Sequence, residues 1–319
     1  MIEGKRFFIT GGRGFIASHI AEALIAHNRV VLYDNGHRGS LAETTLMEHP
    51  HVTFIQGDVL DPAALRRAMD GADTVIHCAA IAGIDTVVKR PMDTMRVNLV
   101  GTQNVLEAVV AAGVRKVVNF STSEVYGPQV YRASEEAPTT QGPVGKIRWS
   151  YAVSKLAAEH LAQAYADALG IEVVSVRPFN VYGPRQAGES AIQKFVVGAV
   201  RNETLTVTGD GTQIRAWCFV GDFVDALLRI LDRTFTKMEV FNIGNPQGTV
   251  TILELAQKVI ALAESSSRIQ FREQTGPDVE IRVPSIAKAE GLLGFTPKVG
   301  LEAGILATIE YFRKHELRG

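Results

Sequence analysis

Residues 7–20, FFITGGRGFIASHI, decide the fold class because they join a strand to a helix through a glycine-rich turn. The apolar run ends at Thr10, and Gly11, Gly14 and Ala17 follow at the spacing of a dinucleotide-binding turn. Small residues here let a pyrophosphate approach the backbone N–H groups at the positive end of the helix dipole. Since any tight strand-to-helix turn needs glycine, the glycine pattern indicates a dinucleotide site only when the surrounding sequence supports it.

Outward from this turn, short β-branched runs alternate with amphipathic helical patterns as far as about Phe179. This order predicts an α/β fold: a Rossmann-type, doubly wound parallel sheet covered by helices on both faces. The expected strands are residues 6–10, 29–34, 52–58, 74–80, 116–122 and 172–178, with helices at 15–28, 61–71, 97–113 and 150–170.

Beyond Phe179 the sequence becomes richer in glycine and proline, with helices interspersed. One of these spans residues 251–265, where Thr251 and Glu254 have the spacing of a capping box. We therefore expect residues 1–178 to bind the dinucleotide and carry the catalytic groups. Residues 179–319 are expected to form a smaller α/β substrate lobe that is interleaved with the first part.

Composition narrows the classes of function. The chain has 319 residues, 46% hydrophobic and 21% charged, and a net charge of −1, so neither nucleic acid nor membrane is an expected partner. Cys78 and Cys218 lie in apolar stretches, which predicts buried thiols and no metal site. No h-region follows Met1 and no apolar run has a membrane span's length, so the cytoplasm is the expected location.

Asp34 supports a nicotinamide cofactor. It ends the second expected strand twenty residues after Gly14, where a carboxylate would accept hydrogen bonds from the adenosine ribose. A carboxylate would also repel a 2′-phosphate, which favours NAD over NADP, although Arg38 works against this preference. Asp58, at the end of the third strand, either meets the adenine edge or caps a turn.

Tyr151 and Lys155 stand one helical turn apart, on the same face of a predicted helix. A phenol with its usual pKa near 10 is a poor base at neutral pH, and a nearby ammonium group favours its ionised form. The same ammonium group can hold the nicotinamide ribose. Alone, this spacing is usually a coincidence, but here it follows a dinucleotide motif and the strand end Ser121-Thr122-Ser123.

With these motifs in place, the chain resembles the extended short-chain dehydrogenase/reductase family, specifically its nucleotide-sugar epimerases, dehydratases and decarboxylases. The resemblance covers almost the whole chain, although the family usually has glycine where Ala17 stands. It rests on the motifs TGGRGFIAS, YDN, GDV, HCAA, VNLVGTQNVLEA, STSEVYG, YAVSK, RPFNVYGPR, GDGTQIRAW and FNIGNP.

The resemblance implies a role for each matching residue. Tyr151 would be the general base, Lys155 its partner, and Thr122 the hydroxyl bonded to the sugar O4. Asn180, Arg215 and Arg282 would hold the diphosphate of a nucleotide sugar, most commonly a UDP-sugar, and the two helices at 97–113 and 150–170 would form a homodimer. The cofactor NAD would lie against Gly11, Gly14, Phe15, Ile16, Asp34, Asn35, Asp58, Val59, Ala79, Ala80, Asn98, Tyr151 and Lys155.

Glu124 bears on which reaction follows C4 oxidation. Dehydratases of the family typically have an Asp-Glu pair here and epimerases a small or neutral residue, whereas this chain has Ser123-Glu124. Ser123-Glu124, and Ala216 after Arg215, resemble the residues that UDP-glucuronate decarboxylases have at these positions. We place 4-epimerase first because it is the broader group, then decarboxylase, then 4,6-dehydratase.

Two alternatives stay open. Glu124 could instead cap the backbone of the following turn. The chain could also be a nucleotide-sugar or NAD(H)-binding protein without turnover, although the intact Thr122, Tyr151 and Lys155 argue against this.

Overall fold

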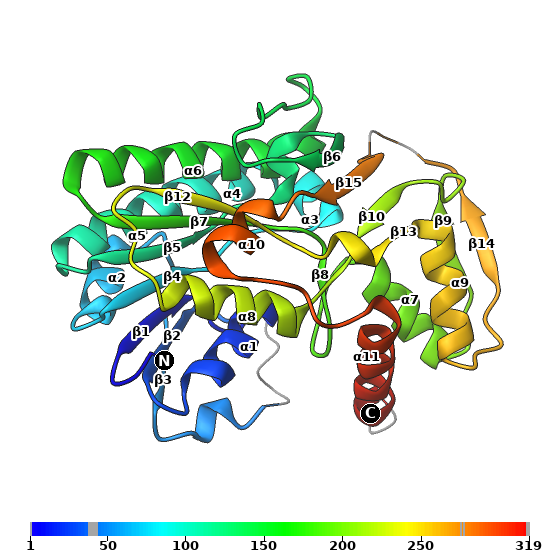
Figure 1. The fold of residues 1–319 in the computed structure, drawn as a ribbon, viewed down its shortest axis with the longest axis horizontal. Helices are drawn as coiled ribbons and strands as arrows, with labels where there is room; N and C mark the ends of the chain where they lie inside the picture. Colours follow the sequence, from blue (N-terminus) through cyan, green and yellow to red (C-terminus); the bar gives the residue numbers. More distant parts are fainter. Residues whose placement is uncertain (1, 38–43, 275, 277, 317–319) are drawn as a thin grey trace. The chain divides into compact units, whose positions relative to one another are not determined.

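The computed structural model describes residues 2–37, 44–274, 276 and 278–316 (Figure 1). The chain divides into two compact units, each made of three segments. The first contains Met1–Val125, Gln141–Arg177 and Val224–Phe241, and the second contains Tyr126–Thr140, Pro178–Phe223 and Asn242–Gly319. The sequence analysis divides the chain at residue 178 and expects the two parts to be interleaved, and in the structure the chain crosses between the units five times.

A seven-stranded sheet in the order β12-β7-β5-β4-β1-β2-β3 organises the first unit. The pairs from β3 to β7 run parallel, with Phe8 opposite Val31 on one side and Val75 on the other. This confirms the predicted doubly wound Rossmann sheet, to which β12 adds an unpredicted seventh strand. The strands are β1 (Arg6–Thr10), β2 (Arg29–Asp34), β3 (Val52–Gln56), β4 (Thr74–His77), β5 (Lys116–Phe120), β7 (Glu172–Pro178) and β12 (Glu239–Ile243).

The strand order reverses beside β1, because β2 and β3 lie on one side of it and β4, β5 and β7 on the other. In sheets of this kind ligands bind at the carboxyl ends of the strands where the order reverses. The glycine turn after β1 and the segment after β4 both start at that edge. The fold therefore brings the candidate cofactor residues together.

Helices cover both faces of the sheet (Figure 1). A π-helical turn, Arg96–Val100, precedes α5 within the single helix expected at residues 97–113. The helices are α1 (Phe15–Leu24), α2 (Pro62–Met69), α3 (Ile84–Lys89), α4 (Pro91–Met95), α5 (Gly101–Ala111), α6 (Ser150–Leu169) and α8 (Val220–Leu231), the last of which begins in the second unit.

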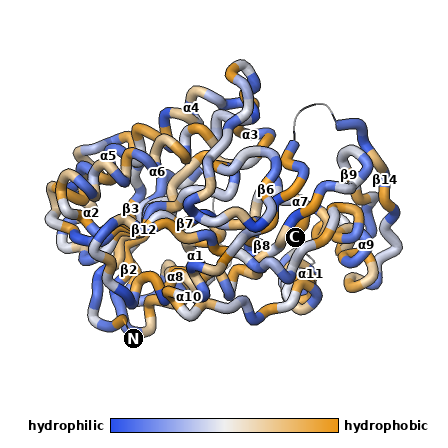
Figure 2. Tube along the Cα trace, turned by 45° about the horizontal axis from the view of Figure 1, so that its top comes forward, coloured by the Kyte–Doolittle hydropathy of each residue, from blue (hydrophilic) through white to orange (hydrophobic). Residues whose placement is uncertain are grey.

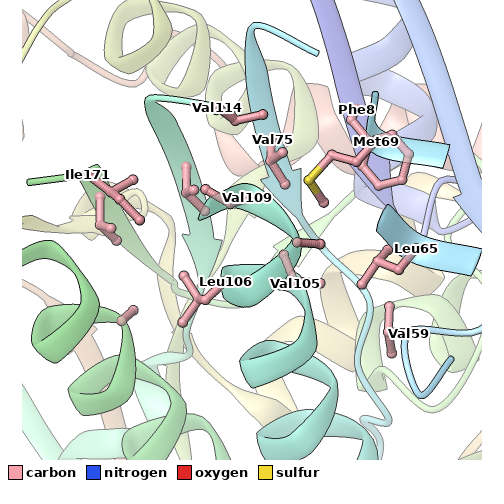
Figure 3. Packing of buried hydrophobic residues seen from close by; sticks show 14 of the residues in the cluster. Phe8, Val59, Leu65, Met69, Val75, Val105, Leu106, Val109, Val114 and Ile171 are labelled. Carbon is pink, nitrogen blue, oxygen red and sulfur yellow. The ribbon is translucent and has the colours of Figure 1, made fainter. Parts of the chain in front are cut away.

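A continuous apolar core joins the sheet to α2, α5 and α6. Leu65 and Met69 of α2 lie against Phe8 and Val75 of the strands, and Val105 of α5 lies close by (Figure 3). Orange and blue alternate along α2 and α5 in Figure 2, as expected of helices with one buried face. This packing fixes the sheet edge on which the site is built.

The second unit contains a four-stranded sheet in the order β13-β10-β15-β6 and two pairs, β11-β8 and β14-β9. Its α9 begins with the predicted capping box: Thr251 Oγ1 accepts from the Glu254 amide at 3.1 Å, and the Glu254 carboxylate accepts from the Thr251 amide at 2.8 Å. Its elements are β6 (Gln129–Ala133), β8 (Val181–Tyr182), α7 (Ala191–Val200), β9 (Leu205–Thr208), β10 (Ile214–Ala216), β11 (Cys218–Phe219), β13 (Thr249–Thr251), α9 (Ile252–Leu262), β14 (Ile269–Arg272), β15 (Ile281–Pro284), α10 (Ala287–Leu293) and α11 (Leu301–Glu316).

Within the described part of the chain, no helix combines the length and apolarity that a membrane span requires. Cys78 and Cys218 are both free thiols. Cys218 is fully buried as expected, whereas Cys78, directly after β4, keeps partial exposure.

Candidate active site

The turn after β1 leaves no room for side chains. Gly11 has φ +66°, and a Cβ there would lie 2.7 Å from the Ala79 backbone nitrogen, so only glycine fits. Gly14 is the N-cap of α1. It has no side chain to cap the backbone amides of the first turn, which include those of Phe15 and Ile16. A cradle with a bare helix N-terminus fits the pyrophosphate of a dinucleotide.

Asp34 stands beside this turn, at the end of β2. Its carboxylate accepts hydrogen bonds from the Arg13 amide at 3.1 Å and from the Gly36 amide at 2.7 Å. These two backbone donors fix the carboxylate at the edge of the turn, where a ribose diol could use its remaining lone pairs. Arg38, which works against an NAD preference, lies outside the described residues.

The next candidate group follows β3. Asp58 accepts a hydrogen bond from the Leu60 amide at 2.9 Å. This is the contact of a turn cap, one of the two alternatives that the sequence analysis gives for Asp58. Its second oxygen accepts from the Asn35 side chain at 3.4 Å, so Asn35 and Asp58 lie together. Val59 is buried, and its carbonyl accepts from the Asn104 side chain at 2.8 Å.

Asn98 fastens the segment that follows β4, Ala79 and Ala80 included. Its side chain accepts from the Ile81 amide at 2.8 Å and donates to the Ile81 carbonyl at 3.1 Å, as a paired strand would. Asn98 lies within the π-helical turn, a distortion that often marks functional sites. Its amide nitrogen also donates to Ser154 of α6 at 3.0 Å. Asn98 therefore ties the segment after β4 to helix α6.

Helix α6 carries Tyr151 and Lys155. Ser154 donates to the Tyr151 carbonyl at 2.7 Å, and Lys155 is only 1% exposed. Burial lowers the pKa of Lys155 to about 8, although Cys78 and Glu159 act in the opposite direction. A lysine with this pKa is mostly protonated at neutral pH, so it supplies the cation that a phenolate needs.

One helical turn beyond Lys155, Glu159 forms a buried ion pair with Arg177 of β7. The pair joins α6, which carries the predicted catalytic residues, to β7 of the sheet. Breaking such a pair by removing one partner leaves an uncompensated buried charge and is strongly destabilising.

Glu124 is held by a turn and by a neighbouring arginine. Thr122, Ser123 and Glu124 follow β5, and Thr122 Oγ1 accepts from the Glu124 amide at 3.2 Å. The Glu124 carboxylate accepts from Arg148 at 2.7 and 3.4 Å. Arg148 lies three residues before Tyr151 and its guanidinium stacks 5.2 Å from the Trp149 ring centre. This ion pair favours the carboxylate form of Glu124 and links the hydroxyl cluster to the start of α6.

Arg215 and Arg282 lie in the second unit, on neighbouring strands. They are direct partners in the parallel register of β10 and β15, and both are buried. Arg282 donates to the Gly127 carbonyl at 2.7 Å, and Arg215 lies 3.6 Å from Asp278. The two arginines are neighbours across the strand pair, so their buried positive charges would stabilise an anion bound beside them.

Asn180 lies in the same unit with φ +40°, a backbone conformation in which asparagine is enriched. Its side chain donates to the Ala216 carbonyl at 2.9 Å, next to Arg215. The structure thus groups the three predicted diphosphate ligands within one unit and the predicted catalytic residues within the other.

Sequence reasoning missed three residues that organise the first unit: Arg148, Arg177 and His77. Arg148 had a usable signal, because it precedes Tyr151 by one helical turn. His77 and Arg177 begin the quoted motifs HCAA and RPFNVYGPR, but each sits in an apolar strand and has partners distant in sequence, so the motif alone did not indicate its role.

Comparison with known proteins agrees with this geometry. Residues 7–244 match the NAD dependent epimerase/dehydratase family. The UDP-N-acetyl-alpha-D-glucosaminuronate decarboxylase of Bacillus cytotoxicus is 35% identical, over 98% of this chain and 99% of its own. UDP-glucuronic acid decarboxylase 3 of Arabidopsis thaliana is 37% identical, over 97% and 89%. The UDP-glucuronic acid 4-epimerase of Bacillus cereus, solved with UDP-glucuronic acid and NAD, is 29% identical with a TM-score of 0.88, over 97% and 99%.

The buried charge of Lys155 predicts an unusual pH dependence of stability. Lysine titrates at 10.5 when unperturbed and at about 8 in the folded chain. Below pH 8 both states are protonated, and burying the charge costs up to about 3 kcal/mol. Between the two values the unfolded state binds more protons, so the free energy of unfolding rises with pH and the cost disappears.

We therefore expect Lys155→Met to stabilise the ligand-free protein at pH 7, with a stability difference from wild type that shrinks as pH approaches 10.5. Urea unfolding of both proteins across this range measures the difference. Lys258→Met, which changes an exposed lysine, is the control. A difference that is independent of pH would contradict a lowered pKa for Lys155.

Proposed function

We propose that this chain, which belongs to the NAD dependent epimerase/dehydratase family, decarboxylates a UDP-linked uronic acid. It is an NAD-dependent enzyme that modifies a nucleotide sugar through transient oxidation at C4, as the sequence analysis predicted. When bound, NAD accepts the hydride of C4 and later returns it. The choice among the possible reactions rests on the groups around Glu124.

The first step uses Tyr151, Lys155 and Thr122. Tyr151 removes the O4 proton, the buried Lys155 cation stabilises the resulting phenolate, and the Thr122 hydroxyl orients O4. Loss of the C4 hydride then leaves a 4-keto sugar. In a uronic acid this ketone makes the C6 carboxylate a β-keto acid.

Decarboxylation then moves the electrons of the C5–C6 bond into the C4 carbonyl, which releases CO2 and leaves an enolate. A proton must reach C5 before the ketone is reduced. The Ser123 hydroxyl, which stands between Thr122 and Glu124 in the sequence, would donate this proton and take one back from water, so that the step consumes one solvent proton. The ionised Glu124 would repel the substrate carboxylate and so favour its loss as neutral CO2.

The observation that carries this proposal is the ion pair between Glu124 and Arg148 at 2.7 Å. A dehydratase needs an acid to protonate the departing O6, and an arginine-paired carboxylate beside a serine supplies none. The two decarboxylase relatives, similar over nearly the whole chain, support the same choice.

A second candidate, 4-epimerisation, is the reaction that the sequence analysis placed first. The solved 4-epimerase similar to this chain holds UDP-glucuronic acid with NAD. A UDP-uronic acid is therefore the substrate class that both candidates share. For either reaction, Arg215 and Arg282 would hold the diphosphate or the uronate carboxylate, with Asn180 positioning β10.

We also propose a homodimer that uses the two predicted helices. Ala158 and Ala162 are fully buried within the chain, but Val110 on the first helix and Val153 and Leu169 on the second are exposed apolar residues. At α4 and the π-helical turn, where the first helix begins, Met92 is 84% and Val100 42% exposed. An open hollow there is lined by Pro91, Met92, Met95, Arg96, Leu99, Val100 and Ser150.

Incubation with UDP-glucuronate tests the proposed reaction. We expect mass spectrometry to show a UDP-pentose formed by loss of CO2, and no product from Tyr151→Phe. A new chromatographic peak with unchanged mass would establish the epimerase instead. Loss of water, or no reaction with any UDP-uronic acid, would contradict both candidates.

Glu124→Gln separates the two roles of the carboxylate. Decarboxylation should fall by about 100-fold or more because a preorganised charge beside the reacting carboxylate is lost, whereas an epimerase should tolerate the change within about tenfold. NAD affinity should not change. Glu107→Gln, which alters a surface carboxylate of the same unit, is the matched control.

Val100→Arg tests the dimer surface. A charge introduced on this apolar patch should convert the dimer into monomers on size-exclusion chromatography. Met47→Arg, at a site with a similar exposure of 46%, should elute unchanged. A Val100→Arg protein that still elutes as a dimer would place the interface elsewhere.

A further inference from the structure

His77 is a buried titratable residue that the proposed reaction does not use. It ends β4 and is only 1% exposed. Its Nδ1 lies 2.7 Å from the hydroxyl of Thr10, at the end of β1, and its Nε2 lies 3.0 Å from the hydroxyl of Thr102 in α5. The ring thus bridges the strand before the glycine turn and the helix after Asn98.

The neighbours of these hydroxyls decide where each proton lies. Thr102 Oγ1 is 2.6 Å from the Asn98 carbonyl, which can only accept, so Thr102 donates its proton there. Thr102 must then accept from His77, which places a proton on Nε2.

The other side is consistent with this assignment. The Ala79 amide donates to Thr10 Oγ1 at 3.3 Å, which leaves the Thr10 proton to donate to the bare Nδ1 of His77. The ring is therefore the neutral Nε2–H tautomer. Burial, and then the charge of Lys155, lowers the pKa of His77 to about 3, so the ring stays neutral at working pH.

The bridge continues to the catalytic helix. Asn98 donates to Ser154 at 3.0 Å, and Ser154 donates to the Tyr151 carbonyl at 2.7 Å. All five side chains, those of Thr10, His77, Thr102, Asn98 and Ser154, are at most 1% exposed. Two runs of hydrogen bonds therefore meet at Asn98: one links its backbone carbonyl to the Ala79 amide, and the other links its side chain to the Tyr151 carbonyl.

We propose that His77 is a positioning residue that holds the cofactor-side segment after β4 and the catalytic helix α6 in one fixed arrangement. This inference rests on the proposed function only in one respect, namely that Tyr151 is the base that removes the O4 proton. The histidine contributes an acceptor toward Thr10 and a donor toward Thr102. Because neither direction can reverse, the arrangement does not vary with pH.

The geometry of amide side chains allows the two halves to be separated. Asn at position 77 reaches as far as the ring's Nδ1 and can keep the contact with Thr10. Gln reaches as far as Nε2 and can keep the contact with Thr102. Thr10→Val and Thr102→Val remove the same two contacts from the other side with almost no change in shape.

We expect His77→Gln and Thr10→Val to weaken NAD binding by about fivefold or more, with kcat at saturating cofactor within about twofold of wild type. His77→Asn and Thr102→Val should lower kcat by about tenfold or more and leave NAD affinity within about twofold. Calorimetric titration and steady-state kinetics measure the two effects. Thr308→Val is the matched control, since Thr308 is equally buried and donates to the Gly304 carbonyl four residues earlier, in the second unit.

Nitrogen NMR of histidine-labelled protein gives a readout that does not depend on turnover. His77 should remain a single neutral Nε2–H tautomer between about pH 5 and pH 9. An Nδ1–H tautomer, or titration in that range, would overturn the proposal. It would also fail if the four variants only lost stability, as Thr308→Val would, with kcat and NAD affinity unchanged. If wild type turned over no nucleotide sugar, the proposed function would fail while NAD binding and the tautomer still tested His77.

Discussion

The buried ammonium group of Lys155 is the constraint on which the first unit depends. Because the Lys155 side chain is only 1% exposed, its charge must be accommodated by the polar groups around it. Glu159 and Arg177 form their ion pair one turn below it, Ser154 is tied to Asn98 beside it, and His77 nearby stays neutral. The catalytic helix is thereby fixed to the sheet by polar contacts as well as by apolar packing.

This arrangement connects the fold to the chemistry. The parallel sheet delivers the glycine turn, the segment after β4 and the hydroxyl cluster after β5 to one edge, because the carboxyl ends of parallel strands meet there. The contact between Glu124 and Arg148 adds the link from that edge to the start of α6. The sequence analysis expects Glu124 either to take part in catalysis or to cap a turn. The structure shows in addition that its ion pair with Arg148 holds the start of α6, which the sequence motif does not indicate.

The sequence predicted the sheet and the cofactor turn because both rest on local patterns: an apolar run, glycine spacing and Asp34 at a strand end. It did not predict β12 or the residues at which the interleaved segments cross between the units, since these depend on pairing between distant residues. The homodimer through the two helices stays a prediction, because apolar residues on several faces of a helix indicate burial without showing whether the chain itself or a partner buries them. Buried polar partners such as His77 and Arg177 leave no periodic signal in an apolar strand.

The central claim is that Tyr151, Lys155 and Thr122 support removal and return of a single hydride at C4. Turnover of UDP-glucuronate carrying deuterium at C4, followed by mass spectrometry and NMR of the product, tests this most directly. The account predicts that the product keeps the deuterium at C4 whether CO2 is lost or the centre is inverted. Loss of the label to solvent, or its appearance at another carbon, would contradict it.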